Sequence, residues 1–402
     1  MLVLAIMQVV GTVGVGIAPS IGVLLAGEVT QNEAWAGLAR TASTLGAALM
    51  GIPLGNLAAR FGRRFALSSG WWIAALGSAI LVYAAQYSSV VPLFVGLLLI
   101  GAGSAATLQS RFAATDLAQP AHRSRSLSLI VWVGTVGYVL GPNLGIPGGA
   151  IGAATGLTVY ASAFLIAAVC LALAGLLVFV MLRPDPLQVL ARQSSSGAVA
   201  PQRKSGRLRQ MVAEVRRNPR ARYAAVAILS AQIVMVSVMT MTPVHLEHQG
   251  GSIAIIGITI SLHIAGMYAL SPVVGILADR YGYRLTIVLG IVILLASFLI
   301  GILKPDEVGW LMTSLVLLGL GWSFVNVSGS SLFSAAVPDG IRASAQGGVD
   351  ALSNLCGATA AFAAGPLLAV SSFPVLNVLA AIIMVPLIFL TMGRNHRGNL
   401  AS

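Results

Sequence analysis

The sequence predicts an all-α membrane protein in which 12 transmembrane helices form two six-helix bundles related by a parallel repeat. Three observations predict this class. The 402 residues are 57% hydrophobic and only 8% charged, the apolar residues gather in stretches of about 20, and two short segments recur at a fixed offset. A soluble enzyme, a disordered chain and a disulfide-stapled secreted domain are excluded, because none of them carries so much apolar surface.

Twelve apolar stretches are long enough to cross a bilayer, at about 20 residues for each helix. In the first half they are Leu2 to Ala26, Trp35 to Ala58, Ala66 to Ala85, Val91 to Gln109, Leu127 to Leu144 and Leu157 to Leu182. In the second half they are Tyr223 to Val244, Ile253 to Ala278, Leu285 to Leu303, Trp310 to Ala336, Ala343 to Val370 and Pro374 to Met392.

A basic linker separates the halves and defines three parts. Residues 1–182 are expected to form the N-terminal bundle, residues 183–222 the linker and residues 223–402 the C-terminal bundle. Leu208 to Arg217 is either a basic amphipathic helix on anionic lipid or a solvated part of the linker. With both termini in the cytoplasm, every lysine and arginine except Arg40 and Lys304 lies on the cytoplasmic side. The positive-inside rule therefore predicts a multi-pass protein of the cytoplasmic membrane with both termini inside. The same distribution explains the net charge of +12 without a nucleic-acid partner.

Glycine and arginine positions reveal the repeat. Gly55, Arg60, Gly62 and Arg64 recur 220 positions later as Gly275, Arg280, Gly282 and Arg284. Gly101 and Gly103 recur as Gly319 and Gly321, and Gly141 with Pro142 recurs as Gly365 with Pro366. Six spans in each half keep both copies in the same orientation, so the repeat is parallel and not inverted.

These segments resemble the major facilitator superfamily over essentially the whole chain. The stretch from Gly55 to Arg64 looks like the family signature between spans two and three, which implies the major facilitator fold and a gating role for the two signature loops. Gating residues on this resemblance are Gly55, Arg60, Gly62, Arg63, Arg64, Gly275, Asp279, Arg280, Gly282 and Arg284. Ala59 stands where the family usually has an acid, and Asp116 is the expected substitute partner for Arg60 or Arg64. The alternative is that these arginines only enforce topology.

Span five carries a second resemblance. Gly137, Gly141 and Pro142 are similar to the glycine-proline signature of the 12-span drug/proton antiporter branch, and small residues with a proline predict close packing and a kink that seats a gate. A generic kink is the other interpretation. The arginine that this branch carries early in span four is absent, since Leu97 occupies the matching position.

Active transport needs an energy source, and no lysine follows a phosphate-cradling glycine loop. We therefore expect no cofactor, no enzymatic activity and coupling to a proton gradient. Ten of the 11 acids fall in loops or at helix ends. The exception, Asp350, comes eight residues after Arg342, about 12 Å along a helix. Burial there would suit a proton carrier, whereas a structural hydrogen-bonded acid is the alternative.

Other embedded polar and flexible residues are candidates for substrate contact. They are Arg40, Gln232, Met235, Met239, His263, Tyr268 and Asn354. His263 is also a possible proton relay, while packing or rim positions are the competing interpretation for the histidine, the arginine and the methionines. His245, Glu247 and His248 are too few for a metal site, so no metal is expected.

The leading functional hypothesis is proton-coupled efflux of amphipathic or hydrophobic small molecules, including drugs, by alternating access of a monomer. A proton-coupled importer of a small organic solute is the second hypothesis. A lipid carrier would need a lateral opening, and a divalent-metal carrier would need more embedded His, Asp or Glu. The low aromatic content of 6% and the methionines favour apolar cargo over sugars.

Overall fold

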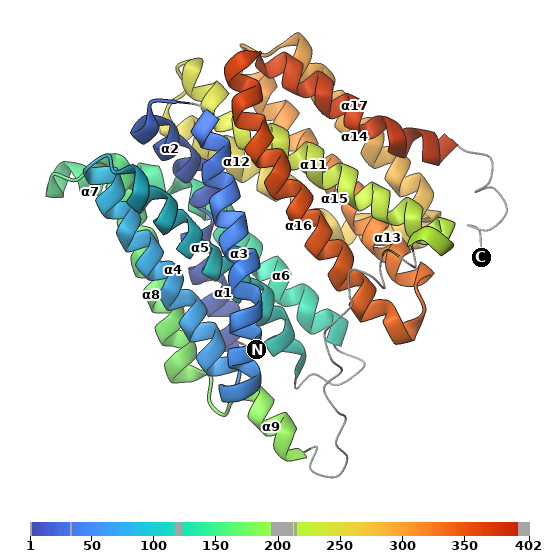
Figure 1. Cartoon of the computed structure of the whole chain (residues 1–402), viewed down its shortest axis with the longest axis horizontal. Coiled ribbons are helices and arrows are strands. Elements are labelled where there is room, and N and C mark those ends of the chain that lie inside the picture. Colours follow the sequence, from blue (N-terminus) through green and yellow to red (C-terminus); the bar gives the residue numbers. More distant parts are fainter. Residues whose placement is uncertain (1, 33, 117–122, 194–211, 213–214, 393–402) are drawn as a thin grey trace. The chain divides into compact units, whose positions relative to one another are not determined.

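The computed structural model describes residues 2–32, 34–116, 123–193, 212 and 215–392, and every secondary-structure element within them is a helix (Figure 1). The predicted all-α class is thus confirmed. The chain divides into two compact units. Unit 1 comprises Met1–Ala200 with Leu246–Ser261, and unit 2 comprises Pro201–His245 with Leu262–Ser402. The division between the units therefore falls inside the helices that follow the linker.

Unit 1 is built from the helices of the first half. They are α1 (Leu2–Val15), the π-helical turn η1 (Ala18–Gly22), α2 (Val23–Thr30), α3 (Ala34–Phe61), α4 (Arg63–Gln86), α5 (Val90–Asp116), α6 (Arg123–Leu140), the 3₁₀ turn η3 (Gly141–Leu144), α7 (Gly145–Thr155), α8 (Val159–Met181) and α9 (Pro186–Gln193). The start of the linker thus contributes a short helix, whereas most of the predicted amphipathic segment 208–217 lies outside the described residues.

The described part of the second half contains seven helices. They are α11 (Pro219–His248), α12 (Ile253–Tyr268), α13 (Ser271–Tyr281), α14 (Tyr283–Leu303), α15 (Val308–Ala336), α16 (Asp339–Val370) and α17 (Phe373–Met392). The end of α11 and the first part of α12 belong to unit 1.

Ten helical stretches in the described chain are long and apolar enough to span a membrane. The second and fifth predicted spans are helical, in α3 and α6, and they are not among these ten because both include residues whose side chains lie outside the described part of the chain.

Prolines account for three interruptions of the predicted spans. Pro19 lies in the π-helical turn that separates α1 from α2. Pro142 lies in η3, between α6 and α7. Pro272 is at the start of α13, directly after the break from α12. Proline lacks the N–H of an i→i−4 bond and clashes with the preceding turn, which explains why each helix is interrupted there.

Small residues allow close helix packing in both units. A Cβ atom on Gly101 of α5 would lie 2.4 Å from the carbonyl oxygen of Ser43 in α3. At the repeat-related position, a Cβ on Gly319 of α15 would lie 2.3 Å from the carbonyl oxygen of His263 in α12. In each half, therefore, the fourth span packs its glycine directly on the backbone of the second span.

The core of unit 1 centres on Trp71 of α4, which is fully buried. Its ring fills the space left by two glycines, because a Cβ on Gly11 of α1 would lie 2.5 Å from the ring and one on Gly103 of α5 would lie 3.4 Å from it. In unit 2, Ser297 of α14 and Ser314 of α15 donate to each other's backbone carbonyls over 2.7 and 2.8 Å. Such interhelical hydrogen bonds stabilise the packing of spans, because lipid tails are as apolar as the helix surfaces and the hydrophobic effect does not drive the helices together.

Candidate functional site

Three side chains from different helices meet in unit 2. The indole nitrogen of Trp322 (α15) donates to the side-chain oxygen of Gln232 (α11) over 3.1 Å. The ring of Tyr268 (α12) meets the indole edge to face, with centroids 6.0 Å apart at 73°. All three side chains are half-buried. We call Gln232, Tyr268 and Trp322 the aromatic-amide cluster.

The aromatic-amide cluster combines two kinds of recognition. The two rings offer apolar faces for a planar or aliphatic group, and the amide and phenol offer hydrogen bonds. Helix α16 comes close to it, since a Cβ on Gly357 would lie 3.3 Å from the Gln232 side-chain nitrogen. Of the three residues, sequence reasoning found Gln232 and Tyr268 and missed Trp322.

The remaining predicted contact residues of α11 and α16 lie in different environments. Met235 and Met239 are only 3% and 5% exposed, so in this structure they pack within unit 2. Asn354 is exposed, and its side-chain nitrogen donates to the backbone carbonyl of Asp350 over 3.0 Å. Their i, i+4 spacing places Asn354 and Asp350 on the same stripe of α16.

His263 is completely buried in the packing of α12 against α15. Its Nδ1 lies 2.7 Å from the carbonyl oxygen of Leu315. A carbonyl can only accept, so Nδ1 carries the proton in this hydrogen bond. The imidazole is thus oriented by the backbone of α15.

Asp350 has an exposed side chain on α16, which differs from the burial expected from its distance to Arg342. Asp350 lies 11 residues after the start of α16 at Asp339, and its carboxylate is accessible to solvent or to a partner.

Arg40 is half-buried in the second turn of α3, in unit 1. Its backbone carbonyl accepts from the hydroxyls of Ser43 and Thr44, over 2.9 and 3.0 Å. These residues give this part of α3 a polar character that is unusual for a membrane span.

The two signature loops have the same backbone conformation. Gly62 separates α3 from α4 with φ +93°, and Gly282 separates α13 from α14 with φ +90°. In each loop the glycine N–H donates to the carbonyl four residues earlier, over 2.9 Å to Ala58 and 3.0 Å to Ala278. A positive φ strains any residue with a Cβ, which explains why both copies carry glycine here. A Cβ on Gly275 would meet no atom within 4 Å in the described structure, so close packing of another helix does not require glycine at this position.

The first signature loop is held by an acid that sequence reasoning missed. Asp185 precedes α9 and is 7% exposed. One carboxylate oxygen accepts from the backbone N–H of Arg64 over 2.8 Å, and the other accepts from that of Leu187 over 2.9 Å. Asp185 thus caps the N-termini of α4 and α9 together, where a negative charge is favourable. A Cβ on Gly62 would lie 2.3 Å from this carboxylate.

Two signature arginines, Arg64 and Arg284, contact the last span of their own half. Arg64 lies over the ring of Phe179 in α8, 4.9 Å from its centroid. Arg284 at the start of α14 donates to the backbone carbonyl of Thr391 in α17. Arg63 donates to the side chain of Gln109 in α5 over 2.9 Å. The arginines therefore tie the third span to the fourth or sixth.

The predicted charge partners are only partly described. The side chains of Ala59 and Asp116 lie outside the described part, so the expected pairing of Asp116 with Arg60 or Arg64 stays a prediction. Asp279 and Arg280 are both exposed at the end of α13, and Arg280 lies over the ring of Tyr281, 5.7 Å from its centroid.

The glycine-proline segment packs α6 directly on α1. A Cβ on Gly137 would lie 2.1 Å from the Thr12 hydroxyl, and one on Gly141 would lie 2.7 Å from Gly16. Directly after this contact, Pro142 lies in η3. The next residue, Asn143, donates from its side chain to the Ser261 hydroxyl over 2.7 Å. Close packing and a helix break, both predicted from the sequence, occur here together.

A buried polar network behind this contact was not foreseen. Gln8 of α1 is 1% exposed and accepts from the Ser110 hydroxyl of α5 over 2.7 Å. The Thr12 hydroxyl lies 2.6 Å from the Gln8 carbonyl and 2.9 Å from the Gly134 carbonyl of α6. The network joins α1, α5 and α6. A glutamine within a predicted first span was the signal that could have revealed it.

His245, one of the three residues weighed as metal ligands, is engaged by neighbours in unit 2. Its Nε2 lies 2.7 Å from the carbonyl oxygen of Pro305. Its ring stacks on Phe373 with centroids 4.4 Å apart. These contacts give the ring a packing role at the end of α11.

Comparison with known proteins identifies the family. The model of the Major Facilitator Superfamily matches residues 1–255 and 243–400. YdeG of Bacillus subtilis, an uncharacterized MFS-type transporter, is 37% identical over 396 residues, which is 98% of this chain and 91% of YdeG. The riboflavin transporter RfnT of Brucella anthropi is 29% identical over 396 residues, covering 96% of this chain and 94% of RfnT.

Solved structures agree at the level of the fold. The crystal structure of the nucleoside transporter NupG superposes with a TM-score of 0.74 at 18% identity, over 97% of this chain and 98% of NupG. Together with the parallel repeat and the paired signature loops, these matches show that the chain belongs to the major facilitator superfamily and is a membrane transporter, not an enzyme.

Proposed function

We propose that the chain exports amphipathic or hydrophobic small molecules across the cytoplasmic membrane, as a monomer that exchanges them for protons. The aromatic-amide cluster carries this proposal. Two aromatic rings beside a single amide suit a ligand that is largely apolar and has one polar edge, whereas a sugar would need many hydrogen-bonding groups.

Import of a small organic solute is the second candidate, and one observation favours it. RfnT, which matches this chain over nearly its whole length, is a riboflavin transporter. A flavin has a planar ring system with a polar edge, so the same aromatic and amide groups suit it. The two candidates differ in direction, which a fold does not encode.

We propose Asp350 as the proton-coupling carboxylate, with His263 as the alternative. A carboxylate within a predicted membrane span is costly unless it binds a proton or lines water. The exposed Asp350 side chain is accessible for proton exchange. His263 is fully buried and bonded to the α15 backbone, which favours a packing role for it.

Transport by proteoliposomes tests both parts of the proposal. A panel of fluorescent dyes and riboflavin is offered with an imposed pH gradient, and flux is recorded in each direction. Asp350→Asn removes the titrating group and keeps its shape, so uphill transport should disappear while downhill exchange of substrate remains. Asp306→Asn makes the same chemical change outside the spans and should leave both activities unchanged. Uphill transport by Asp350→Asn with an unaltered pH profile would assign coupling elsewhere.

A further inference from the structure

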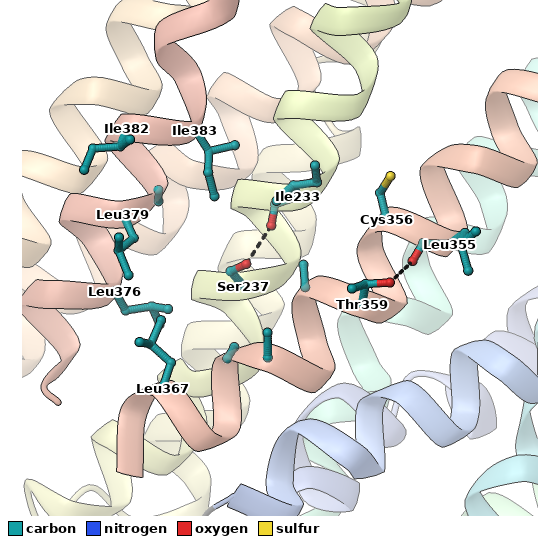
Figure 2. A pocket seen from close by; sticks show the side chains of 14 residues that line it. Ile233, Ser237, Leu355, Cys356, Thr359, Leu367, Leu376, Leu379, Ile382 and Ile383 are labelled. Carbon is teal, nitrogen blue, oxygen red and sulfur yellow. Dashed lines mark hydrogen bonds between the residues drawn. The ribbon is translucent and has the colours of Figure 1, made fainter. Parts of the chain in front are cut away.

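A cavity of about 520 Å³ lies within unit 2, between α11, α16 and α17 (Figure 2). Its volume is within the range of roughly 300–1,000 Å³ that small-molecule sites occupy. The aromatic-amide cluster does not line it. The cavity is therefore a second site, separate from the one to which transport is assigned above.

The lining offers almost nothing to a polar ligand. Of the 14 lining residues, two carry hydroxyls, and the rest are aliphatic apart from Cys356. Figure 2 shows both hydroxyls turned back to their own helices: Ser237 donates to the Ile233 carbonyl over 2.9 Å, and Thr359 donates to the Leu355 carbonyl over 2.9 Å. With these donors already used, the occupant must be held by apolar contact.

The cavity is continuous with the surface that the spans present to lipid. Leu355 and Ile382 line it and are 63% and 56% exposed. Ile382 also belongs to a row of exposed apolar side chains along α17, with Val375, Val378, Val385 and Phe389. In a membrane span such a row faces the hydrocarbon of the bilayer, so the opening of the cavity meets lipid chains and not water.

We propose that this cavity binds an acyl chain of a bilayer lipid. An apolar space of this size stays dry, and if it were empty its lining would lose van der Waals contacts. The group within reach of the opening is the alkyl chain of a neighbouring lipid, which needs no hydrogen bonds. The inference rests on the membrane location and not on the transported substrate or its direction.

Photolabelling tests the proposal directly. The protein is reconstituted with a phosphatidylcholine that carries a diazirine in its acyl chain, irradiated, and digested for mass spectrometry. Adducts should be severalfold more frequent on the cavity-lining residues of α16 and α17 than on Leu289 and Val292, which are exposed on α14. A chain that merely passes by would label both regions equally.

Two variants separate occupancy of the cavity from general exposure to lipid. Ala363→Phe fills the cavity and should lower labelling there to the level of α14. Ala369→Phe is its control, since Ala369 is exposed on the same helix and does not line the cavity. If Ala363→Phe does not fold, Ala360→Leu fills the same space with a smaller group.

Chemical filling of the cavity needs no change of its own residues. In Cys170→Ala, Cys356 is the single thiol, because the chain has 2 cysteines. Attaching an alkyl group to Cys356 with an alkyl methanethiosulfonate should suppress cavity labelling, and a thiol reductant should restore it. Labelling that matches α14, or that persists after filling, overturns the proposal. Displacement of the lipid by transported dye would also overturn it and would assign the cavity to substrate.

Discussion

At the residue scale, the two acids near the repeated signature loops have different environments. Asp185 is buried and accepts from two backbone N–H groups, whereas Asp279 is exposed. A buried acceptor at two helix N-termini has a structural role. The exposed Asp279 of the second copy does not have this structural role, and we infer that it acts as the gating charge.

Paired alanine substitutions distinguish these roles. Asp185→Ala should destabilise the protein by about 1 kcal/mol, because the N-termini of α4 and α9 lose their cap. Asp185→Asn keeps an acceptor and should lose less. Asp279→Ala should leave the melting temperature unchanged and slow transport, because one conformational state loses a charged contact. Thermal unfolding in detergent and flux in proteoliposomes measure the two effects, and equal melting temperatures for both alanine variants would contradict the assignment.

The direction in which the Trp322 side chain faces could not be predicted from the sequence. It lies in the middle of a long apolar run, where a tryptophan that faces lipid and one that faces a ligand look alike. A position far from either end of α15 was the available signal, since tryptophans in membrane proteins gather at the interfaces. Its N–H bond to Gln232 is a long-range contact that depends on how α11 packs against α15.

Replacing Trp322 tests the aromatic-amide cluster. Trp322→Phe keeps a ring and removes the N–H donor, so the Gln232 oxygen loses its partner at a cost of about 1 kcal/mol, or roughly fivefold in apparent substrate affinity. Trp310→Phe makes the same change at an exposed position of the same helix and should have no effect. KM and maximal rate from transport assays give the comparison. An unchanged KM in Trp322→Phe would separate this cluster from substrate binding.

At the element scale, most helix positions could be predicted because apolar length fixes a span. α4, α14, α15 and α17 match the predicted ranges within a few residues. The interruptions could not be predicted as well. Pro142 falls in a break between helices, but Pro366 lies inside the continuous α16. Whether a proline kinks or ends a helix depends on what neighbouring backbone and side chains satisfy the freed carbonyls.

The contact of α6 with α1 gives an element-scale prediction. Gly137→Ala would drive a methyl group into the Thr12 hydroxyl and the Val9 carbonyl, 2.1 and 2.3 Å away. The two helices would have to separate, so we expect a lower melting temperature and impaired transport. Gly149→Ala is the control, because a Cβ there meets no atom within 4 Å in the described structure. Thermal unfolding that ranks the two variants equally would show that α6 and α1 are not tightly packed.

At the scale of the whole molecule, the repeat could be predicted from the sequence because it is marked by glycines and arginines whose roles are local. The positive φ of Gly62 and Gly282 and the close packing of Gly101 and Gly319 belong to each half separately. The boundaries of the two units are harder to predict from the sequence. Leu246–Ser261 joins unit 1 although the chain order places it in the second half, through contacts such as Asn143 with Ser261. Such contacts depend on tertiary packing, which no periodic pattern of residues in the sequence predicts.

The orientation of the molecule is the prediction that the charge distribution makes most directly. Nearly all lysines and arginines fall on one side of the twelve spans, and translocating them would be costly, so that side should be cytoplasmic. In a Cys170→Ala, Cys356→Ala background, Gln188→Cys on α9 and Asp306→Cys between α14 and α15 replace exposed residues and should report opposite sides of the membrane. A membrane-impermeant maleimide added to intact cells should label Asp306→Cys at once and Gln188→Cys only after permeabilisation. The reverse pattern would invert the topology and, with it, place the signature arginines and Asp350 at the outer face.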